Sequence, residues 1–246
     1  MSLEVLGCRV DELDAVAATD RILEFAQTAA KAQVVTLGTE MIVYAQRENE
    51  FKQIINQSAL SLCDTIGLLL VARLRGSQLR ARVTGVKLIE DICEGAARLG
   101  VRVFLLGGAS GIAASAAAEL RERYPDLQIA GEHHGYFNDV QDSEVAQQIA
   151  GSQAAILFVG LGFPRQEFWI ARHLAATGCG VAIGIGGSFD VISGKVKRAP
   201  AVWQRFGLEW LYRLVSEPQR WRRQLALPQF VWLVLTERLR RGASST

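Results

Sequence analysis

The chain has 246 residues, half of them hydrophobic, and carries a formal net charge of +2. This length suits one large α/β domain or one domain with an appendage. No uninterrupted apolar run reaches the ~18–20 residues that a membrane-spanning helix requires. The first residues, MSLEVLGCRVDELD, carry acidic side chains early and lack a basic segment followed by an apolar one, so we expect no signal peptide and a cytoplasmic location. Four cysteines without CxxC spacing and three histidines favour buried free thiols over a zinc site.

The apolar pattern of the first hundred residues alternates between short strands and helices. Residues 1–12 indicate a short strand or arm, and residues 33–37 and 60–63 indicate two short strands. Helices are predicted over residues 14–31, 40–49, 51–57, 66–74 and 86–99, and a polar loop over 77–84. Thr36 and Asp64 are then expected at the carboxyl ends of neighbouring strands, where side chains converge in open α/β sheets.

The second half of the chain continues the same alternation. Residues 101–137 have the pattern of a βαβ crossover, with strands over 101–108 and 127–130, a helix over 112–124 and a final loop GEHHGYF. A helix over 143–150 follows. The continuous apolar runs 154–159 and 180–185 are typical of strands that are buried on both faces of a parallel sheet.

Glycines follow both of these buried runs. Gln166 lies beyond the first strand end and Asp190 beyond the second, which describes a ligand crevice at the carboxyl edge of a parallel sheet. We therefore expect a Rossmann-like, mostly parallel sheet flanked by helices over residues 1–194. The composition changes near Lys195, so residues 195–246 are expected to form a helical, membrane-docking appendage.

The charge of the tail supports that boundary. Between Lys195 and Arg241, eleven Lys or Arg residues stand against three Glu, a local net charge of +8 that leaves −6 for the rest of the chain. Four of the five tryptophans lie in the same stretch. Basic residues interleaved with aromatic and leucine side chains are typical of a segment that faces anionic lipid. A solvated helical hairpin whose aromatics pack on the core is the alternative, and no nucleic-acid motif accompanies the tail.

Single residues near the predicted crevice each allow two interpretations. Asp64 follows an apolar strand and is either a helix N-cap or a general base that points into the crevice. Arg82 is either a solvated loop charge or a guanidinium that holds a diphosphate. Gln166 either lies on a helix surface or uses its amide on a phosphate or sugar hydroxyl.

Other candidate binding groups are weaker on their own. The turn Gly107–Gly111 can cradle a phosphate, but it lacks GxGxxG and the Lys-Ser/Thr of a P-loop, so tight strand-to-helix geometry explains it as well. Tyr136 can stack on a base or pack on the sheet. Lys195, Lys197 and Arg198 are expected to form a solvated or interfacial basic rim, with phosphate attraction as the alternative.

Taken together, these motifs resemble the WecG/TagA/CpsF glycosyltransferase family, glycosyltransferase family 26. The resemblance runs from about Leu3 to about Arg223, and the run beyond Pro228 is longer than it requires. It is carried by TLGTEM (36–41), DTIG (64–67), RVTG (82–85), VFLLGG (103–108), HHGYF (133–137), VGLGFPRQEFWI (159–170), GIGGSFDVISGKVKRAP (184–200) and GLEWLYRL (207–214).

The resemblance implies a reaction and a place for it. Such enzymes transfer a sugar from a nucleotide donor to a polyprenyl-diphosphate-linked sugar at the cytoplasmic face of the membrane, in the synthesis of teichoic-acid linkers or cell-surface polysaccharide. We therefore expect an inverting transferase that uses a UDP-hexose or UDP-N-acetylhexosamine. No DxD-like acidic pair lies near the glycine turns, so we also expect a metal-independent enzyme without a cofactor.

The resemblance also assigns roles to residues. Asp64 is expected to be the base that deprotonates the acceptor hydroxyl, with Thr36 and Arg82 in the same pocket. The donor nucleotide-sugar is expected to contact Gln166, Tyr136, Asp190 and the turn glycines Gly107, Gly108, Gly162, Gly186 and Gly187. The acceptor and the membrane surface are expected to meet Lys195, Lys197, Arg198, Arg213, Arg220, Arg222 and Arg223.

Two positions depart from the family pattern. The family commonly has Asn where Gly38 stands and Gly where Thr65 stands. Gly38 lacks an amide that could orient the sugar or the acceptor, so we expect it to affect donor preference, and Thr65 adds a side chain where the usual residue leaves room. We expect no nucleic-acid partner, and a homo-oligomer stays open. Two other functions are kept: a nicotinamide or flavin oxidoreductase that uses the turn Gly107–Gly111, and a non-catalytic membrane-associated scaffold.

Overall fold

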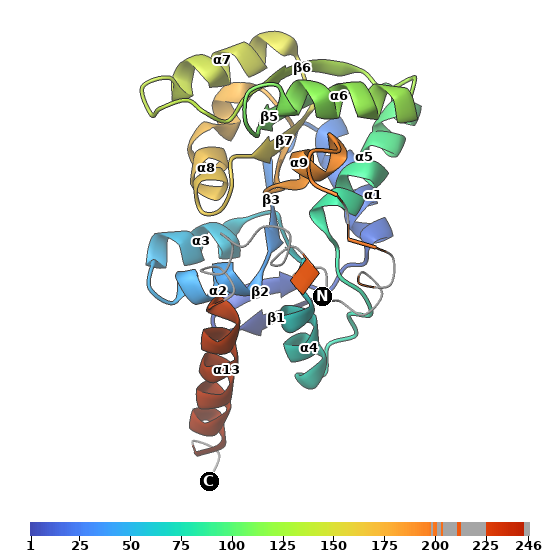
Figure 1. Ribbon diagram of the computed structural model, residues 1–246. Coiled ribbons are helices and arrows are strands. Elements are labelled where there is room, and N and C mark those ends of the chain that lie inside the picture. Colours follow the sequence, from blue (N-terminus) through green and yellow to red (C-terminus); the bar gives the residue numbers. More distant parts are fainter. Residues whose placement is uncertain (198, 201–202, 204–210, 213–224, 244–246) are drawn as a thin grey trace.

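The fold is that of a computed structural model, which describes residues 1–197, 199–200, 203, 211–212 and 225–243. Among these residues, one eight-stranded sheet has the order β1-β2-β4-β3-β8-β7-β5-β6 (Figure 1). The β1–β2 pair is antiparallel and every other pairing is parallel. The strands are β1 (Ser2–Val5), β2 (Cys8–Asp11), β3 (Ala32–Leu37), β4 (Leu60–Cys63), β5 (Val103–Gly107), β6 (Ile129–His133), β7 (Ile156–Gly160) and β8 (Val181–Gly184).

Helices cover both faces of the sheet, as in a three-layer α/β domain. Helices α1, α5, α6 and α9 share one apolar cluster with one face, whereas α2, α3, α4, α7 and α8 pack in clusters on the other face (Figure 1). This arrangement confirms the predicted mostly parallel α/β fold. The helices are α1 (Ala15–Gln27), α2 (Thr39–Ala45), α3 (Asn49–Gln57), α4 (Ile66–Leu74), α5 (Gly85–Leu99), α6 (Ile112–Arg123), α7 (Asp142–Ser152), α8 (Arg165–Thr177), α9 (Ser188–Ile192) and α13 (Ala226–Ala243).

The central strands are buried on both faces, which explains their unbroken apolar sequences. In β7, Ile156 and Phe158 contribute to the cluster on one face, and Leu157 and Val159 contribute to the cluster on the other. Side chains alternate between the two faces of a strand, so a strand covered on both sides needs an apolar residue at every position. The four cysteines are buried and free, as predicted.

Several boundaries differ from the predictions, because the predicted helices 14–31 and 40–49 end at Gln27 and Ala45, and the two ends of the sheet also differ. Residues 1–12 form an antiparallel hairpin of two strands rather than a single strand or arm. Strand β6 begins at Ile129 and continues to His133, so it includes the first residues of the predicted loop GEHHGYF. Pairing with β5 explains the extension, because this contact between distant segments is not encoded in the local pattern.

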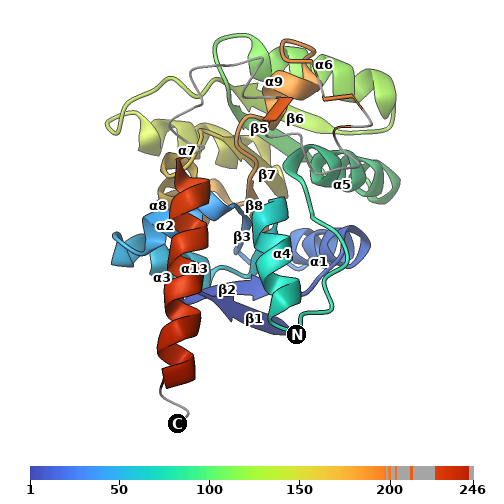
Figure 2. The ribbon, with the colours of Figure 1, turned by 60° about the horizontal axis from the view of Figure 1, so that its bottom comes forward.

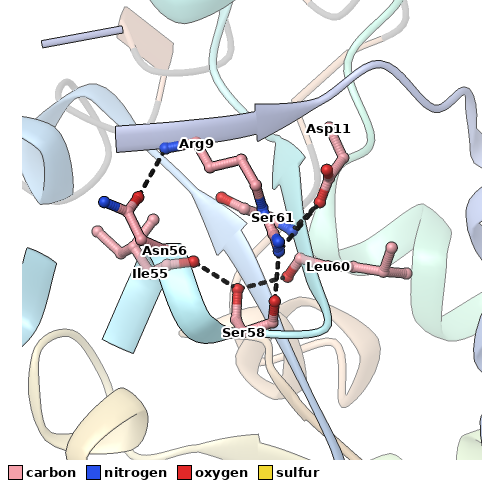
Figure 3. Close-up of polar contacts among 7 residues, drawn as sticks. All are labelled: Arg9, Asp11, Ile55, Asn56, Ser58, Leu60 and Ser61. Atoms are coloured by element: carbon pink, nitrogen blue, oxygen red, sulfur yellow. Dashed lines mark hydrogen bonds and ion pairs between the residues drawn. The ribbon is translucent and has the colours of Figure 1, made fainter. Parts of the chain in front are cut away.

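Side chains fix the hairpin to the edge of the sheet (Figure 3). The β2–β4 register contains a single residue pair. Around it, the Arg9 backbone N–H donates to Asn56 Oδ1 at 2.8 Å, the Arg9 guanidinium donates to the Ser58 carbonyl, and the Ser61 N–H donates to Asp11 Oδ2 at 2.8 Å. These bonds, of which the Arg9 guanidinium bond and the Asp11 bond are charge-assisted, supply the attachment that the short ladder lacks.

The last described helix, α13, packs along α2 (Figure 2). Phe230 is buried in the same apolar cluster as α2, α3 and α4, whereas Trp232 on the other side of α13 is 68% exposed. None of the helices within the described residues is both long and apolar enough to span a membrane. The proposed appendage 195–246 stays a prediction, because most of residues 198–224 fall outside the described part of the chain.

Truncating Phe230 tests whether α13 is part of the folded core. Phe230→Ala removes a fully buried ring, and such changes cost about 3–5 kcal/mol. We expect a loss of about 3 kcal/mol in the free energy of unfolding, measured with urea. The matched change Trp232→Ala alters an exposed ring on the same helix and should stay within about 0.5 kcal/mol of the unmodified protein. Equal effects of the two changes would contradict the packing of α13.

Candidate active site

A cavity of about 250 Å³ opens at the carboxyl ends of β4, β3 and β8. Parallel α/β sheets bind ligands at this edge, because the loops that leave the strands meet there. The lining residues come from four strand-to-helix segments, the loop between α4 and α5, and α13: Thr36, 38–41, 64–67, Arg82, 84–86, Phe163, Gln166, 185–188 and Leu227. The predicted crevice between the ends of β7 and β8 thus extends across β3 to β4.

Asp64 and Arg82 both line this cavity. The Asp64 backbone N–H donates to the Leu37 carbonyl at 3.1 Å, which fixes the end of β4 against the end of β3. The Val83 N–H donates to the Cys63 carbonyl at 2.8 Å and so brings the Arg82 loop to the same strand end. Burial raises the pKa of the Cys63 thiol to about 12, while the Asp64 charge raises it and the Arg82 charge lowers it. A carboxylate and a guanidinium thus both line the cavity, close enough to Cys63 for each charge to act on its thiol.

Thr36 also lines the cavity, but its hydroxyl proton is already used. Thr36 Oγ1 donates to the Gly184 carbonyl at 2.7 Å, which joins the ends of β3 and β8. The hydroxyl oxygen keeps its lone pairs, so it can accept a hydrogen bond from a ligand. Sequence reasoning placed Thr36 in the pocket with Asp64, and the cavity contains both residues.

Gln166 reaches the cavity from the first turn of α8 and is buried. Its Oε1 accepts from the Gly186 N–H at 3.0 Å, and its Nε2 donates to Glu167 Oε1 at 2.7 Å. Gly186 and Gly187 line the cavity as well. Desolvation by burial raises the pKa of Glu167 to about 7, although the hydrogen bond from Gln166 lowers it.

Five of the eight predicted donor-binding residues are not among those that line the cavity, and four of them are Gly107, Gly108, Tyr136 and Gly162. Gly107 and Gly108 lie at the end of β5, and β7 separates β5 from β8 in the sheet. A Cβ atom on Gly107 would collide with the Gly160 carbonyl, so close packing of two strand ends explains this glycine. Tyr136 is 77% exposed, and the Gly162 carbonyl accepts from the Gln166 N–H at 3.0 Å.

Asp190 is also outside the lining of the cavity. It lies on α9, and its carboxylate is 3.3 Å from Lys195 Nζ. Lys195 and Lys197 are exposed where the chain leaves α9. The other basic residues assigned to the acceptor or the membrane lie outside the described residues: Arg198, Arg213, Arg220, Arg222 and Arg223.

The sequence interpretation missed several cavity residues. Phe163 contributes an apolar wall and packs edge-on against Tyr44 and Phe51, with ring centroids 5.2 and 5.4 Å away. Leu227 comes from α13, which has no strand-end signal. Glu40 lines the cavity from the first turn of α2 directly after a strand-ending glycine, so the rule that selected Asp64 could have selected it.

The two departures from the family pattern lie against each other at the cavity wall. Both residues line the cavity, and a Cβ atom on Gly38 would lie 3.4 Å from Thr65 Cγ2, an ordinary van der Waals contact. The Thr65 methyl group therefore stands beside the place where a side chain at position 38 would begin. A substitution at position 38 or 65 therefore changes the space that is available to the side chain at the other position.

Helices α4 and α5 are among the described helices that begin at the cavity without a side-chain cap. Thr65 and Thr84 are the N-cap residues of α4 and α5, and neither side chain bonds to its helix. Uncapped N-termini present backbone N–H groups and a partial positive charge, which suit a phosphate group. Arg82 adds a full positive charge between them. Within the described residues, no three His, Cys, Asp or Glu side chains group closely enough to hold a metal ion.

Several known proteins that are similar to this chain are named as glycosyltransferases. Three of them are named N-acetylglucosaminyldiphosphoundecaprenol N-acetyl-beta-D-mannosaminyltransferase. The protein from Bacillus spizizenii is 39% identical over 204 residues, which cover 83% of this chain and 79% of the relative. The protein from Bacillus subtilis is 35% identical over 84% of this chain and 80% of the relative. The protein from Staphylococcus aureus is 30% identical over 94% of this chain and 91% of the relative.

A family model, glycosyl transferase WecG/TagA/CpsF, matches residues 3–244. The match extends past Arg223, so the expectation that the run beyond Pro228 exceeds the family resemblance was wrong. An oxidoreductase and a non-catalytic scaffold are set aside, because the matched family and the similar proteins are transferases. The chain belongs to the WecG/TagA/CpsF family of glycosyltransferases.

Proposed function

We propose that the protein transfers a hexose or N-acetylhexosamine from a UDP-sugar to a polyprenyl-diphosphate-linked sugar, with inversion at the anomeric carbon. The observation that carries this proposal is the cavity itself, which combines the Asp64 carboxylate, the Arg82 guanidinium and two uncapped helix N-termini. The acceptor class comes from the similar proteins, whose names specify a diphosphoundecaprenol-linked N-acetylglucosamine. Their names also make an N-acetylmannosaminyl donor the first to test.

The proposed chemistry needs one base and a site for a leaving diphosphate. Asp64 accepts the proton of the acceptor hydroxyl as its oxygen attacks the anomeric carbon. The bond between that carbon and the UDP oxygen breaks on the opposite face, which inverts the configuration. Arg82 and the N-termini of α4 and α5 stabilise the negative charge that develops on the departing UDP. Thr36 and Gln166 contribute acceptor and donor groups that position the substrates.

This charge arrangement needs no metal ion to balance the diphosphate, so we propose a metal-independent reaction without a cofactor. The polar groups named above supply the positive side of that balance. Turnover should persist in excess EDTA. Activity that EDTA abolishes and manganese restores would contradict this part of the proposal.

An apolar groove beside the cavity supports the polyprenyl acceptor. The groove has a volume of about 590 Å³ and is lined by Leu3, Glu4, Val71, Leu74, Arg75, Val234 and Leu235. Helices α4 and α13 form its two sides, and β1 lies beneath them (Figure 2). Both helices also begin at the cavity, where Ile66 and Leu227 line its wall.

We propose that the hydrocarbon chain of the acceptor lies in this groove while its diphosphate lies at the cavity. Five of the seven residues that line the groove are apolar, and Leu74 is 80% exposed. Covering such a side chain with hydrocarbon gains about 1.5–3 kcal/mol. Arg75 spans the groove, because it pairs with Glu237 on α13 and donates to the Glu4 carbonyl on β1 at 2.6 Å. The exposed Trp232 and the basic tail are proposed to meet the cytoplasmic face of the membrane.

Replacing the proposed base tests the function directly. Asp64→Asn keeps the shape of the side chain but removes the proton acceptor, so kcat should fall by ~10²–10⁴. Binding of UDP, read as an increase in melting temperature, should stay close to that of the unmodified protein. The control Asp126→Asn changes an exposed carboxylate outside the cavity and should leave kcat unchanged. Undiminished turnover in Asp64→Asn would remove Asp64 from the mechanism.

Introducing a charged side chain into the groove tests whether the hydrocarbon chain of the acceptor binds there. Leu74→Glu should raise KM for an undecaprenyl-linked acceptor about tenfold or more, because hydrocarbon can no longer cover the site. KM for a water-soluble acceptor with the same diphosphate sugar and a short alkyl chain should not change. Leu99→Glu changes a leucine that is 50% exposed at the end of α5 and serves as the control. Equal effects on long and short acceptors would contradict the groove assignment.

A further inference from the structure

Glu167 is a fully buried carboxyl group that the proposed mechanism does not use. It lies in the first turn of α8, next to Gln166. Its Oε1 accepts from Gln166 Nε2 at 2.7 Å, and its Oε2 has no hydrogen-bond partner among the described residues. Its backbone carbonyl accepts from Gln33 Nε2 of β3 at 3.0 Å. Burying a carboxyl group with one oxygen that makes no hydrogen bond lowers the free energy of unfolding. A buried Glu at position 167 is therefore expected to have a compensating role.

The contacts of Gln166 indicate this role. The Gln166 amide has a donor end and an acceptor end, and its direction depends on its neighbours. Gly186 presents an N–H to one end, and Glu167 presents an oxygen to the other. A reversed amide would place two donors together at Gly186 and two acceptors together at Glu167. The pair of contacts therefore permits one direction of the amide.

Close packing leaves this pair little room to move. Gly184 ends β8 directly beneath it, and a Cβ atom there would lie 2.8 Å from Gln166 Nε2 and 3.1 Å from Glu167 Oε1. On its other side, the Gly184 carbonyl accepts from Thr36 Oγ1 at 2.7 Å. Two cavity residues, Thr36 and Gln166, are thus tied to the same strand end.

We infer that Glu167 is a positioning residue, whose carboxyl oxygen fixes the direction of the Gln166 amide and, through it, the position of the Gly186 turn in the cavity wall. One Nε2 hydrogen and one Oε1 lone pair of Gln166 are then left to meet a ligand. The consequence for catalysis rests on the proposed function, in which Gln166 contacts the donor. The orientation of the Gln166 amide does not depend on the proposed function.

The protonation state of Glu167 leaves this role intact. The pKa of Glu167 is raised to about 7, mainly by burial and with a smaller contribution from the negative charge of Glu40, which lines the cavity from α2. The two polar side chains that touch Glu167, Gln33 and Gln166, are neutral. A carboxyl and a carboxylate both keep an oxygen that accepts from Gln166, so the amide keeps its direction on either side of pH 7.

Kinetics with two variants and a control test the role. Glu167→Gln keeps an acceptor oxygen of the same reach, so KM for the UDP-sugar should stay within about threefold of the unmodified value. Glu167→Met has similar size without an acceptor, and KM should rise about tenfold or more while kcat changes less. Gln33→Met removes the other contact of Glu167 and leaves the amide pair intact, so its KM should not change.

These outcomes separate positioning from general loosening of α8. A KM rise in Gln33→Met equal to that in Glu167→Met would overturn the inference, as would an unchanged KM in Glu167→Met. If Glu167→Met does not fold, Glu167→Asp carries the same expectation, because its shorter carboxyl does not reach Gln166 Nε2.

Hydrogen exchange provides a readout that does not depend on activity. The Gly186 N–H is bonded to Gln166 and should exchange slowly in the unmodified protein and in Glu167→Gln. Exchange should become at least tenfold faster in Glu167→Met and stay slow in Gln33→Met. Failure to turn over UDP-sugars would refute the proposed function alone, whereas unchanged Gly186 exchange in Glu167→Met would refute the positioning role.

Thermal stability reports the buried state of the carboxyl separately. The pKa of Glu167 lies above the ordinary value of 4.5, so the folded protein holds its proton more tightly than the unfolded chain does. The associated stability is present below pH 4.5 and is lost as the pH rises to about 7. The melting temperature of the unmodified protein should therefore fall relative to that of Glu167→Gln across this range. A constant difference would contradict the burial on which the inference rests.

Discussion

Burial of the central strands on both faces is the constraint on which the rest of the structure depends. Strands β3, β8, β7 and β5 are covered by helices on each side, so the side chains along their middle form the core and do not reach a ligand. Polar chemistry is therefore confined to the strand ends, where the chain turns into a helix. Asp64, Thr36 and Gln166 all lie within a few residues of such an end. The parallel direction of the strands places these ends on one edge and so brings the residues together.

The same geometry gives the cavity its electrostatic character. Each helix that begins after a parallel strand directs its N-terminal N–H groups toward the shared edge. At this edge, the positive ends of α4 and α5 and the Arg82 guanidinium face the same space as the carboxylates of Asp64 and Glu40. A cavity of this kind can hold a negatively charged leaving group and a proton acceptor at once. That combination is what the proposed glycosyl transfer requires.

The sequence predicted the strands better than it predicted the site. Continuous apolar runs identified β7 and β8, and the position after a strand end identified Asp64 and Thr36 as cavity residues. The same rule selected Gly107. A glycine at a strand end can be required either by a bound ligand or by close packing of the backbone, and the contact with Gly160 shows that packing is the reason here. Glu167 has the sequence position of an ordinary acidic residue in a first helical turn, and its burial depends on contacts with distant strands. Leu227 enters the cavity by docking of a helix far along the chain, which local patterns do not report.

Helix α13 belongs to two parts of the molecule at once, because Phe230 completes an apolar cluster and Leu227 completes a wall of the cavity. During synthesis, the ribosome has made every strand of the sheet before it reaches residue 226. A nascent chain that has folded its sheet still lacks this wall. The pocket is therefore complete only once the segment that carries Leu227 and Phe230 has been made and has docked against the part of the chain that carries Asp64.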